Sequence, residues 1–169
     1  MRSTCFFKFS FISLIIPKKD ILRIAEHKNV VGVKFASADL TLLAQCINET
    51  STSEIVWICG LAESWAITFY SLGARGFTSG LVNVFPEISL KLLSALEERN
   101  YEQATKLVSK ISVFEEMRTK HNNGANVTVV KEALKLQGIH VGNVRLPGLP
   151  FLNSEELSEL KNVIKELSE

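Results

Sequence analysis

The chain has 169 residues, of which 46% are hydrophobic and 22% are charged, and its formal net charge is +1 at pH 7. This is the composition of an ordinary globular protein, with the length of one domain and enough residues to bury a core. The net charge is close to zero, and the sequence has no basic stripe interleaved with aromatics. It therefore lacks the electrostatic pattern of a nucleic-acid-binding protein.

The three cysteines, Cys5, Cys46 and Cys59, are scattered, as are the three histidines. No CxxC or HxxxH spacing occurs, and such spacings are typical of zinc sites, while disulfide frameworks occur in small secreted chains. The sequence therefore predicts no metal site, and it favours a reducing, cytoplasmic location.

Residues 1–16 differ in character from the rest of the chain. A basic start followed by an apolar stretch resembles a signal peptide, but Lys8 interrupts the run and no A-x-A-like cleavage site precedes Pro17. The run is also too short to span a bilayer. The alternation from Phe7 to Phe11 equally suits a strand. We expect a divergent leader or a remnant strand here, and no association with a membrane.

From residue 17 to residue 80, strand and helix patterns alternate. A short helix is predicted from Asp20 as its N-cap, followed by a buried strand at VVGVKF. The next predicted elements are, in order, a helix, a buried strand, a helix and a short strand, at residues 38–48, 54–60, 62–72 and 76–80. Gly73 is expected to end the second of these helices in a left-handed conformation. Strands recurring every 20 to 25 residues or so predict βαβ units, in which a parallel sheet is covered on both sides.

Residues 81–169 are predicted to be helical apart from one proline- and glycine-bearing loop. The segments with helical spacing are residues 85–100, 101–121, 125–138 and 153–169, with the loop at 141–152. Pro86 near N1 marks one helix start, and Asn153 with Glu156 forms a capping-box pattern at another. The predicted α/β architecture is three βα units followed by an all-helical tail.

Lys34 stands at the end of an apolar strand, and Gly60 and Gly80 end the next two. In parallel α/β folds the carboxyl ends of the strands face the reaction site. An amine held among Val31 and Val33 would be partly desolvated, which lowers its pKa, and a neutral amine can attack a ketone to form a Schiff base. The same spacing fits a lysine that extends its ammonium from a strand end into solvent.

Five segments together resemble one family: NVVGVKFASADL, ICGLAES, LGARGFTSGLVN, VVKEALKLQG and VRLPGLPFLNSEELSEL. Over residues 17–166 the chain resembles the C-terminal part of the dihydrodipicolinate synthase and N-acetylneuraminate lyase family. Its members are class I aldolases that act on pyruvate and other 2-oxo acids and fold as (β/α)₈ barrels. The resemblance implies a partial barrel, made of the last three βα units, with a C-terminal helical extension.

The resemblance also implies roles for particular residues. The family lysine that matches Lys34 forms the Schiff base from the sixth strand. Gly60 matches the end of the seventh strand, and Thr78 and Ser79 match the residues of the eighth that line the keto-acid pocket, with Asn83 following. The resemblance thus implies a small-molecule 2-oxo acid substrate, no cofactor, no nucleic-acid partner, and a homo-oligomer for the full-length protein.

Part of the family pattern has no counterpart in this chain. Five earlier βα units would carry a Thr-Thr pair that contacts the keto-acid carboxylate, and a Gly-Arg-Thr-Gly stretch. The proton-shuttling tyrosine would fall at about Cys5 or Phe6, whereas the tyrosines of the chain are Tyr70 and Tyr101. We therefore expect a truncated lyase. The alternative is a non-catalytic fragment that binds full-length paralogues through an open sheet edge.

The branch within the family is not decided by the residues. NVTVVK, residues 126–131, stands where dihydrodipicolinate synthases tend to show Asn-Pro-Ile-Pro-Val-Lys. GLAE and FTSGLVNVFPE are similar to the 5-dehydro-4-deoxyglucarate dehydratase branch. Both branches share the imine chemistry and differ in the group that leaves, so both remain as alternatives.

Three other candidates have simpler interpretations. Cys59 has no histidine at a recognisable partner position, so we expect a buried packing cysteine rather than a nucleophile. Glu63 could assist acid–base chemistry, but a glutamate in the first turn of a helix is favoured by the helix dipole alone. NNGAN, residues 122–126, follows a helix rather than a strand, which predicts a helix–helix turn and not a phosphate-binding loop.

Overall fold

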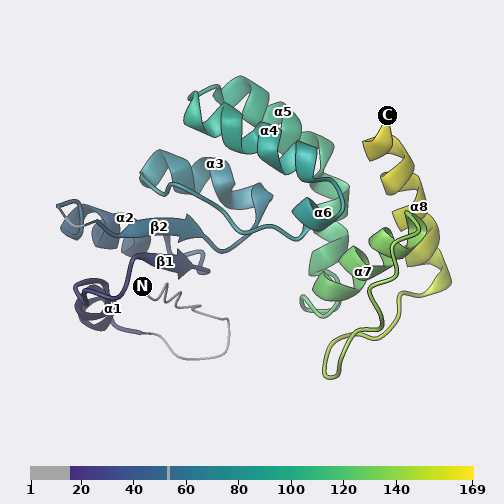
Figure 1. Cartoon of the computed structure of the whole chain (residues 1–169), viewed down its shortest axis with the longest axis horizontal. Coiled ribbons are helices and arrows are strands. Elements are labelled where there is room, and N and C mark those ends of the chain that lie inside the picture. The colour runs from purple at the N-terminus through teal and green to yellow at the C-terminus, as the bar shows by residue number, and fades with distance from the viewer. Residues whose placement is uncertain (1–15, 53) are drawn as a thin grey trace. The chain divides into compact units, whose positions relative to one another are not determined.

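The computed structural model describes residues 16–52 and 54–169 (Figure 1). The chain divides into two compact units, one ending at Thr78 and the other running from Ser79 to Glu169. Each unit has a hydrophobic core of its own. The predicted leader or remnant strand at residues 1–16 lies outside the described residues except for Ile16.

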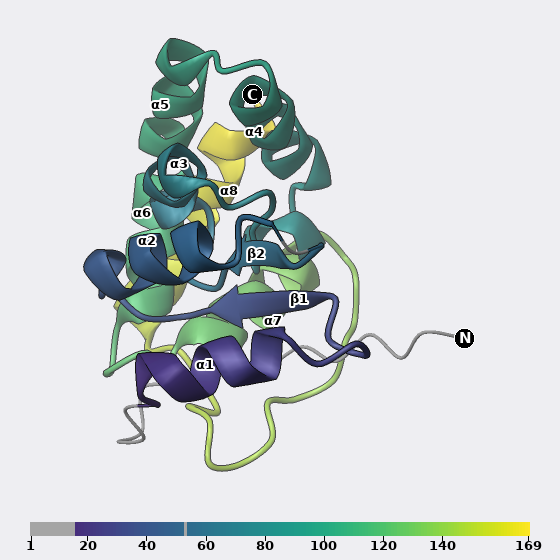
Figure 2. The ribbon, with the colours of Figure 1, turned by 90° about the vertical axis from the view of Figure 1, so that its left-hand side faces the viewer.

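Helices and strands alternate in the first unit, as predicted. The elements are α1 (Lys18–Ala25), β1 (Gly32–Phe35), α2 (Leu40–Glu49), β2 (Val56–Cys59) and α3 (Glu63–Leu72). The two strands pair in parallel, with Lys34 opposite Ile58 and Phe35 opposite Cys59. Figure 2 shows the two arrows side by side. This pairing confirms the βαβ interpretation.

The third predicted strand, residues 76–80, is reduced to a single parallel bridge between Phe77 and Cys59. The chain turns immediately afterwards, because the Ser79 hydroxyl accepts the Val82 amide at 2.8 Å and starts a 3₁₀ turn. The extended segment is consequently too short to form a regular strand, and Gly80 precedes the 3₁₀ turn instead of ending a strand.

One face of the β1–β2 pair carries the core of the first unit. The side chains that alternate toward this core pack with residues of α1, α2 and α3; they are Val33, Phe35, Trp57 and Cys59. The other face carries Lys34, Ile58 and Val56, which is 42% exposed. The helices that the structure describes in this unit thus cover one face of the strand pair.

The ends of two helices show how local residues set their bounds. Asp20 was predicted as an N-cap, but α1 begins at Lys18 after an extended Pro17, and Asp20 is its third residue. The backbone carbonyl of Pro17 accepts the Asp20 amide at 2.9 Å, which incorporates Asp20 into the first turn. At the end of α3, Gly73 adopts a φ of 115°, confirming the predicted left-handed stop.

The second unit is helical. Its elements are η1 (Leu81–Asn83), α4 (Pro86–Glu97), α5 (Tyr101–Lys110), α6 (Ser112–Thr119), α7 (Asn126–Leu136) and α8 (Ser154–Ser168) (Figure 1). Pro86 occupies the first turn of α4, and the capping box of Asn153 and Glu156 starts α8. Both features were predicted. None of the described helices combines the length and the apolarity that crossing a membrane requires.

Residues 101–121 were predicted as one helix and form two, α5 and α6, with a break at Ile111. The Ser112 hydroxyl donates to the Ser109 carbonyl at 2.9 Å, a local bond that competes with regular helix geometry. After α6, the segment 121–125 forms turns before α7, which confirms the helix–helix turn predicted at NNGAN.

Candidate functional site

Lys34 lies on β1, one residue before the carboxyl end of the strand. Its neighbours Val33 and Phe35 are buried in the helix-covered core, so the lysine side chain belongs to the opposite face of the sheet. Lys34 itself is half-buried and faces Ile58 across the parallel pair. Lys34 thus belongs to the face of an apolar strand that the described helices of the first unit do not cover.

Gly60 directly follows β2 and touches the end of β1. Its amide donates to the Phe35 carbonyl at 2.8 Å. A Cβ added at Gly60 would lie 2.7 Å from the Ala36 Cβ and 2.8 Å from the Phe35 oxygen, which are impossibly short contacts. Only glycine therefore allows the two strand ends to approach this closely beside Lys34.

Thr78 joins the same group of strand ends from the third segment. Its amide donates to the Cys59 carbonyl at 2.9 Å, and its hydroxyl lies 3.4 Å from the same oxygen. Backbone pairing therefore brings three of the four predicted site residues, Lys34, Gly60 and Thr78, onto neighbouring carboxyl ends.

Ser79, the fourth predicted site residue, is the first residue of the second unit. Its hydroxyl accepts the Val82 amide at 2.8 Å and lies 3.4 Å from the Ser89 hydroxyl. The side chain thus stabilises the turn that follows Thr78, a role that the sequence did not predict.

Cys59 is a packing cysteine, as predicted. Its thiol is fully buried, and desolvation raises its pKa to about 12, with the Glu63 carboxylate also raising it. A hydrogen bond from the Leu61 backbone, the largest influence after desolvation, lowers the pKa, as does the smaller effect of the Lys34 charge. The Sγ atom donates to the Ala62 carbonyl at 3.6 Å. A thiol with this pKa stays protonated near neutral pH and is a poor nucleophile.

Glu63 is the first residue of α3, as predicted, but it is fully buried. The preceding residue, Ala62, has a φ of 63°, in a region that residues with a Cβ rarely adopt. Such backbone strain concentrates at functional sites and their supports. The one sequence signal that could have revealed the burial is the position of Glu63 in an apolar stretch just after the strand-end glycine.

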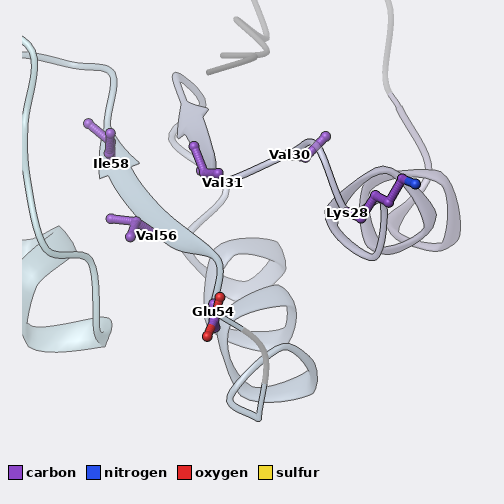
Figure 3. A pocket seen from close by; sticks show the side chains of 7 residues that line it. Lys28, Val30, Val31, Glu54, Val56 and Ile58 are labelled. Carbon is purple, nitrogen blue, oxygen red and sulfur yellow. The ribbon is translucent and has the colours of Figure 1, made fainter. Parts of the chain in front are cut away.

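A hollow of about 450 Å³ lies at the opposite, amino-terminal end of the two strands. Its lining residues are Lys28, Val30, Val31, Gly32, Glu54, Val56 and Ile58. Figure 3 shows Val56 and Ile58 on the same side of β2. Because active sites of parallel barrels form at the carboxyl ends of the strands, this apolar hollow is the open sheet face and not the candidate site.

The structure describes the two tyrosines but not the position expected for a proton-shuttling tyrosine, since Cys5 and Phe6 lie outside the described residues. Tyr70 is buried on α3, and Tyr101 is exposed at the start of α5. Within the described ranges, no group of three or more His, Cys, Asp or Glu side chains is arranged to hold a metal ion.

Comparison with known proteins identifies the family. The model of the dihydrodipicolinate synthetase family matches residues 13–167. A 4-hydroxy-tetrahydrodipicolinate synthase from Cytophaga hutchinsonii is 34% identical over 132 residues, which are 78% of this chain and 43% of that protein. The synthase from Corynebacterium aurimucosum is 30% identical over 151 residues, 89% of this chain and 48% of that protein. The chain thus spans about half the length of these relatives.

Solved structures show the same fold. The crystal structure of dihydrodipicolinate synthase from Oceanobacillus iheyensis matches with a TM-score of 0.87 and 39% identity, over 96% of this chain and 53% of that one. The synthase from Bacillus clausii matches with a TM-score of 0.88 and 33% identity, over 97% of this chain and 54% of that one. The chain is a partial (β/α)₈ barrel followed by a helical extension, and it belongs to the dihydrodipicolinate synthetase family.

Proposed function

We propose that this chain supplies the Schiff-base lysine of a lyase acting on pyruvate or a related 2-oxo acid, and that Lys34 is the nucleophile. The observation that carries the proposal is the position of Lys34, on the face of β1 that the described helices of the first unit do not cover and beside the strand ends at Gly60 and Thr78. Membership of the dihydrodipicolinate synthetase family supports it.

The proposed chemistry begins with attack of the neutral Lys34 amine on the keto carbon of the substrate. The carbonyl oxygen leaves as water, and the imine takes up one proton from the solvent; the resulting protonated imine withdraws electrons from the adjacent carbon. A proton lost from that carbon gives the enamine, which is the carbon nucleophile. The relatives reported above are named as synthases, which favours carbon–carbon bond formation over the dehydratase alternative.

Gly60, Thr78 and Ser79 are proposed to line the oxo-acid pocket. Gly60 allows the ends of β1 and β2 to lie close together beside the lysine, because any side chain there would meet Ala36 and Phe35. Thr78 presents a hydroxyl next to the end of β2. We propose that backbone and hydroxyl groups of the Thr78–Ser79 segment contact the substrate.

The complete reaction requires the rest of a barrel, because this chain spans about half of its relatives. A proton shuttle and the groups that bind the substrate carboxylate would come from that part. We extend the proposal to a homo-oligomeric, cytoplasmic protein, consistent with the free thiols of Cys46 and Cys59.

The test is reductive trapping with pyruvate and sodium borohydride, followed by peptide mass mapping. One arm uses the 169-residue chain alone. A second arm adds the part of the Oceanobacillus iheyensis synthase that this chain does not cover, with its own barrel lysine absent. The expected result is one reduced pyruvate adduct on Lys34 in at least one arm and none without pyruvate. Absence of the adduct from both arms, or labelling of another lysine such as Lys131, would overturn the proposal.

A further inference from the structure

Arg118 is a buried arginine on α6 that the proposed imine chemistry does not use. Its exposed fraction is 6%, and its Nη1 donates to Glu115 Oε1 at 2.5 Å. Its Nη2 donates to Asn126 Oδ1 at 3.0 Å, at the start of α7. Because burying an ion pair costs desolvation energy, such a pair is weak evidence of a stabilising role. Its surroundings point to a second role.

The guanidinium of Arg118 lies flat against Gly80. A Cβ added at Gly80 would be 2.4 Å from Nη2, 2.5 Å from Cζ and 2.9 Å from Nε. Gly80 has a φ of −93° and a ψ of −34°, which any residue adopts. A side chain at residue 80 is therefore opposed by the arginine beside it and not by the backbone conformation, because the guanidinium would have to move.

The arginine packs on the turn that follows the proposed substrate residues. The Gly80 carbonyl accepts the side-chain amide of Asn83 at 3.0 Å, and the Ser79 hydroxyl accepts the Val82 amide. Arg118 Nε is buried and has no hydrogen-bond partner among the residues that the structure describes.

We propose that Arg118 is a positioning residue for the oxo-acid pocket, holding the Ser79–Gly80 backbone in place through flat packing of its guanidinium. Asn126 and Glu115 fix the orientation of the guanidinium from α7 and from α6 itself. The backbone it holds continues directly from Thr78. This inference rests on the proposed function, because Thr78 and Ser79 matter to a substrate only if they line its pocket.

The decisive variant is Arg118→Lys, which keeps a positive charge near Glu115 but loses the planar group. Arg99→Lys, at an exposed position of the same unit, is the matched control. The first measurement is amide hydrogen exchange at Val82, Val84 and Phe85, whose amides bond within the turn. We expect exchange there to rise by about tenfold or more in Arg118→Lys, from the loss of a charge-assisted hydrogen bond and its packing. Amides in α8 should not change.

The second measurement is the pyruvate concentration that gives half-maximal borohydride trapping of Lys34, in whichever arm traps the wild-type chain. A merely structural arginine would alter stability and leave this concentration unchanged. We expect it to rise several-fold in Arg118→Lys and to stay at the wild-type value in Arg99→Lys.

Gly80→Ala tests the contact from its other side, because the new Cβ would displace the guanidinium. It should reproduce the Arg118→Lys effects, and the Gly80→Ala/Arg118→Lys double variant should show less than the sum of the two single changes. Unchanged turn exchange in Arg118→Lys would overturn the proposal, as would increased exchange with an unshifted pyruvate concentration. A wild-type chain that is never trapped is a different result, which rejects the proposed function itself.

Discussion

The amide of Gly60 donates to the carbonyl of Phe35 at 2.8 Å, which joins the carboxyl end of β2 to that of β1. Phe35 directly follows Lys34, so this bond fixes the backbone on which the proposed nucleophile stands. In the parallel register Lys34 lies opposite Ile58, and the Gly60–Phe35 bond follows at the carboxyl ends of the two strands. The close approach of the two ends depends on the absence of a side chain at residue 60.

Gly60→Ala should destabilise the first unit, because its Cβ would lie 2.7 Å from the Ala36 Cβ and 2.8 Å from the Phe35 oxygen. We expect the free energy of unfolding to fall by about 1–3 kcal/mol, the usual cost of overpacking. Urea denaturation followed by circular dichroism measures it. Gly76→Ala is the control: its Cβ would lie 3.8 Å from Ile58, an ordinary contact. Equal losses in the two variants would contradict the steric explanation.

Lys34→Arg should abolish borohydride trapping by pyruvate while leaving the urea midpoint close to that of the wild type. Arginine keeps a positive charge but cannot form the imine. Lys131→Arg serves as the control, since the Lys131 ammonium bonds the Asn143 carbonyl at 2.8 Å, on the loop before α8. That variant should be trapped like the wild type. An adduct that persists in Lys34→Arg would show that another amine reacts.

The Cys59 thiol should resist alkylation in the folded protein, because burial raises its pKa to about 12. The reactive thiolate is then a negligible fraction near neutral pH. Site-resolved mass spectrometry after brief treatment with iodoacetamide should find Cys59 unmodified in buffer and modified in concentrated urea. Rapid alkylation of Cys59 under native conditions would contradict both its burial and the packing interpretation.

Glu156→Gln should destabilise the protein near neutral pH and matter less in acid. The backbone amide of Asn153 and the side chain of His121 hold the pKa of Glu156 below its ordinary value of 4.5. A carboxylate with a lowered folded-state pKa stabilises the fold above its unfolded pKa, and the contribution is lost as pH falls through the folded value. Urea denaturation should therefore show that the wild type has a larger free energy of unfolding than Glu156→Gln at about pH 7, and that this difference is smaller at about pH 3.

The matched control for this pH dependence is Glu159→Gln. Glu159 pairs with Lys120 at 2.6 Å at a partly exposed position, where an ion pair contributes about 0–1 kcal/mol. It takes no part in the capping box of α8. If Glu159→Gln loses as much stability as Glu156→Gln at neutral pH, surface charge and not the capping box accounts for the effect.

Features that depend on near neighbours in the chain were predictable from the sequence. The capping box of Asn153 and Glu156, Pro86 in the first turn of α4 and the left-handed Gly73 all appear where the patterns placed them. Each reflects a preference expressed within about one helical turn. The apolar strand patterns likewise predicted the parallel pair, because buried strands carry continuous apolar runs.

Features that depend on distant partners were decided by the tertiary structure. The sequence suggested a third strand, but the Ser79–Val82 bond ends it after one bridge. The burial of Glu63 depends on how the first turn of α3 packs against the end of β2, and the space at Gly80 depends on where α6 directs Arg118. Local propensity and periodicity describe single elements. A buried carboxylate or a flat guanidinium contact arises only when elements far apart in the chain pack together, because burial and steric exclusion belong to the assembled fold.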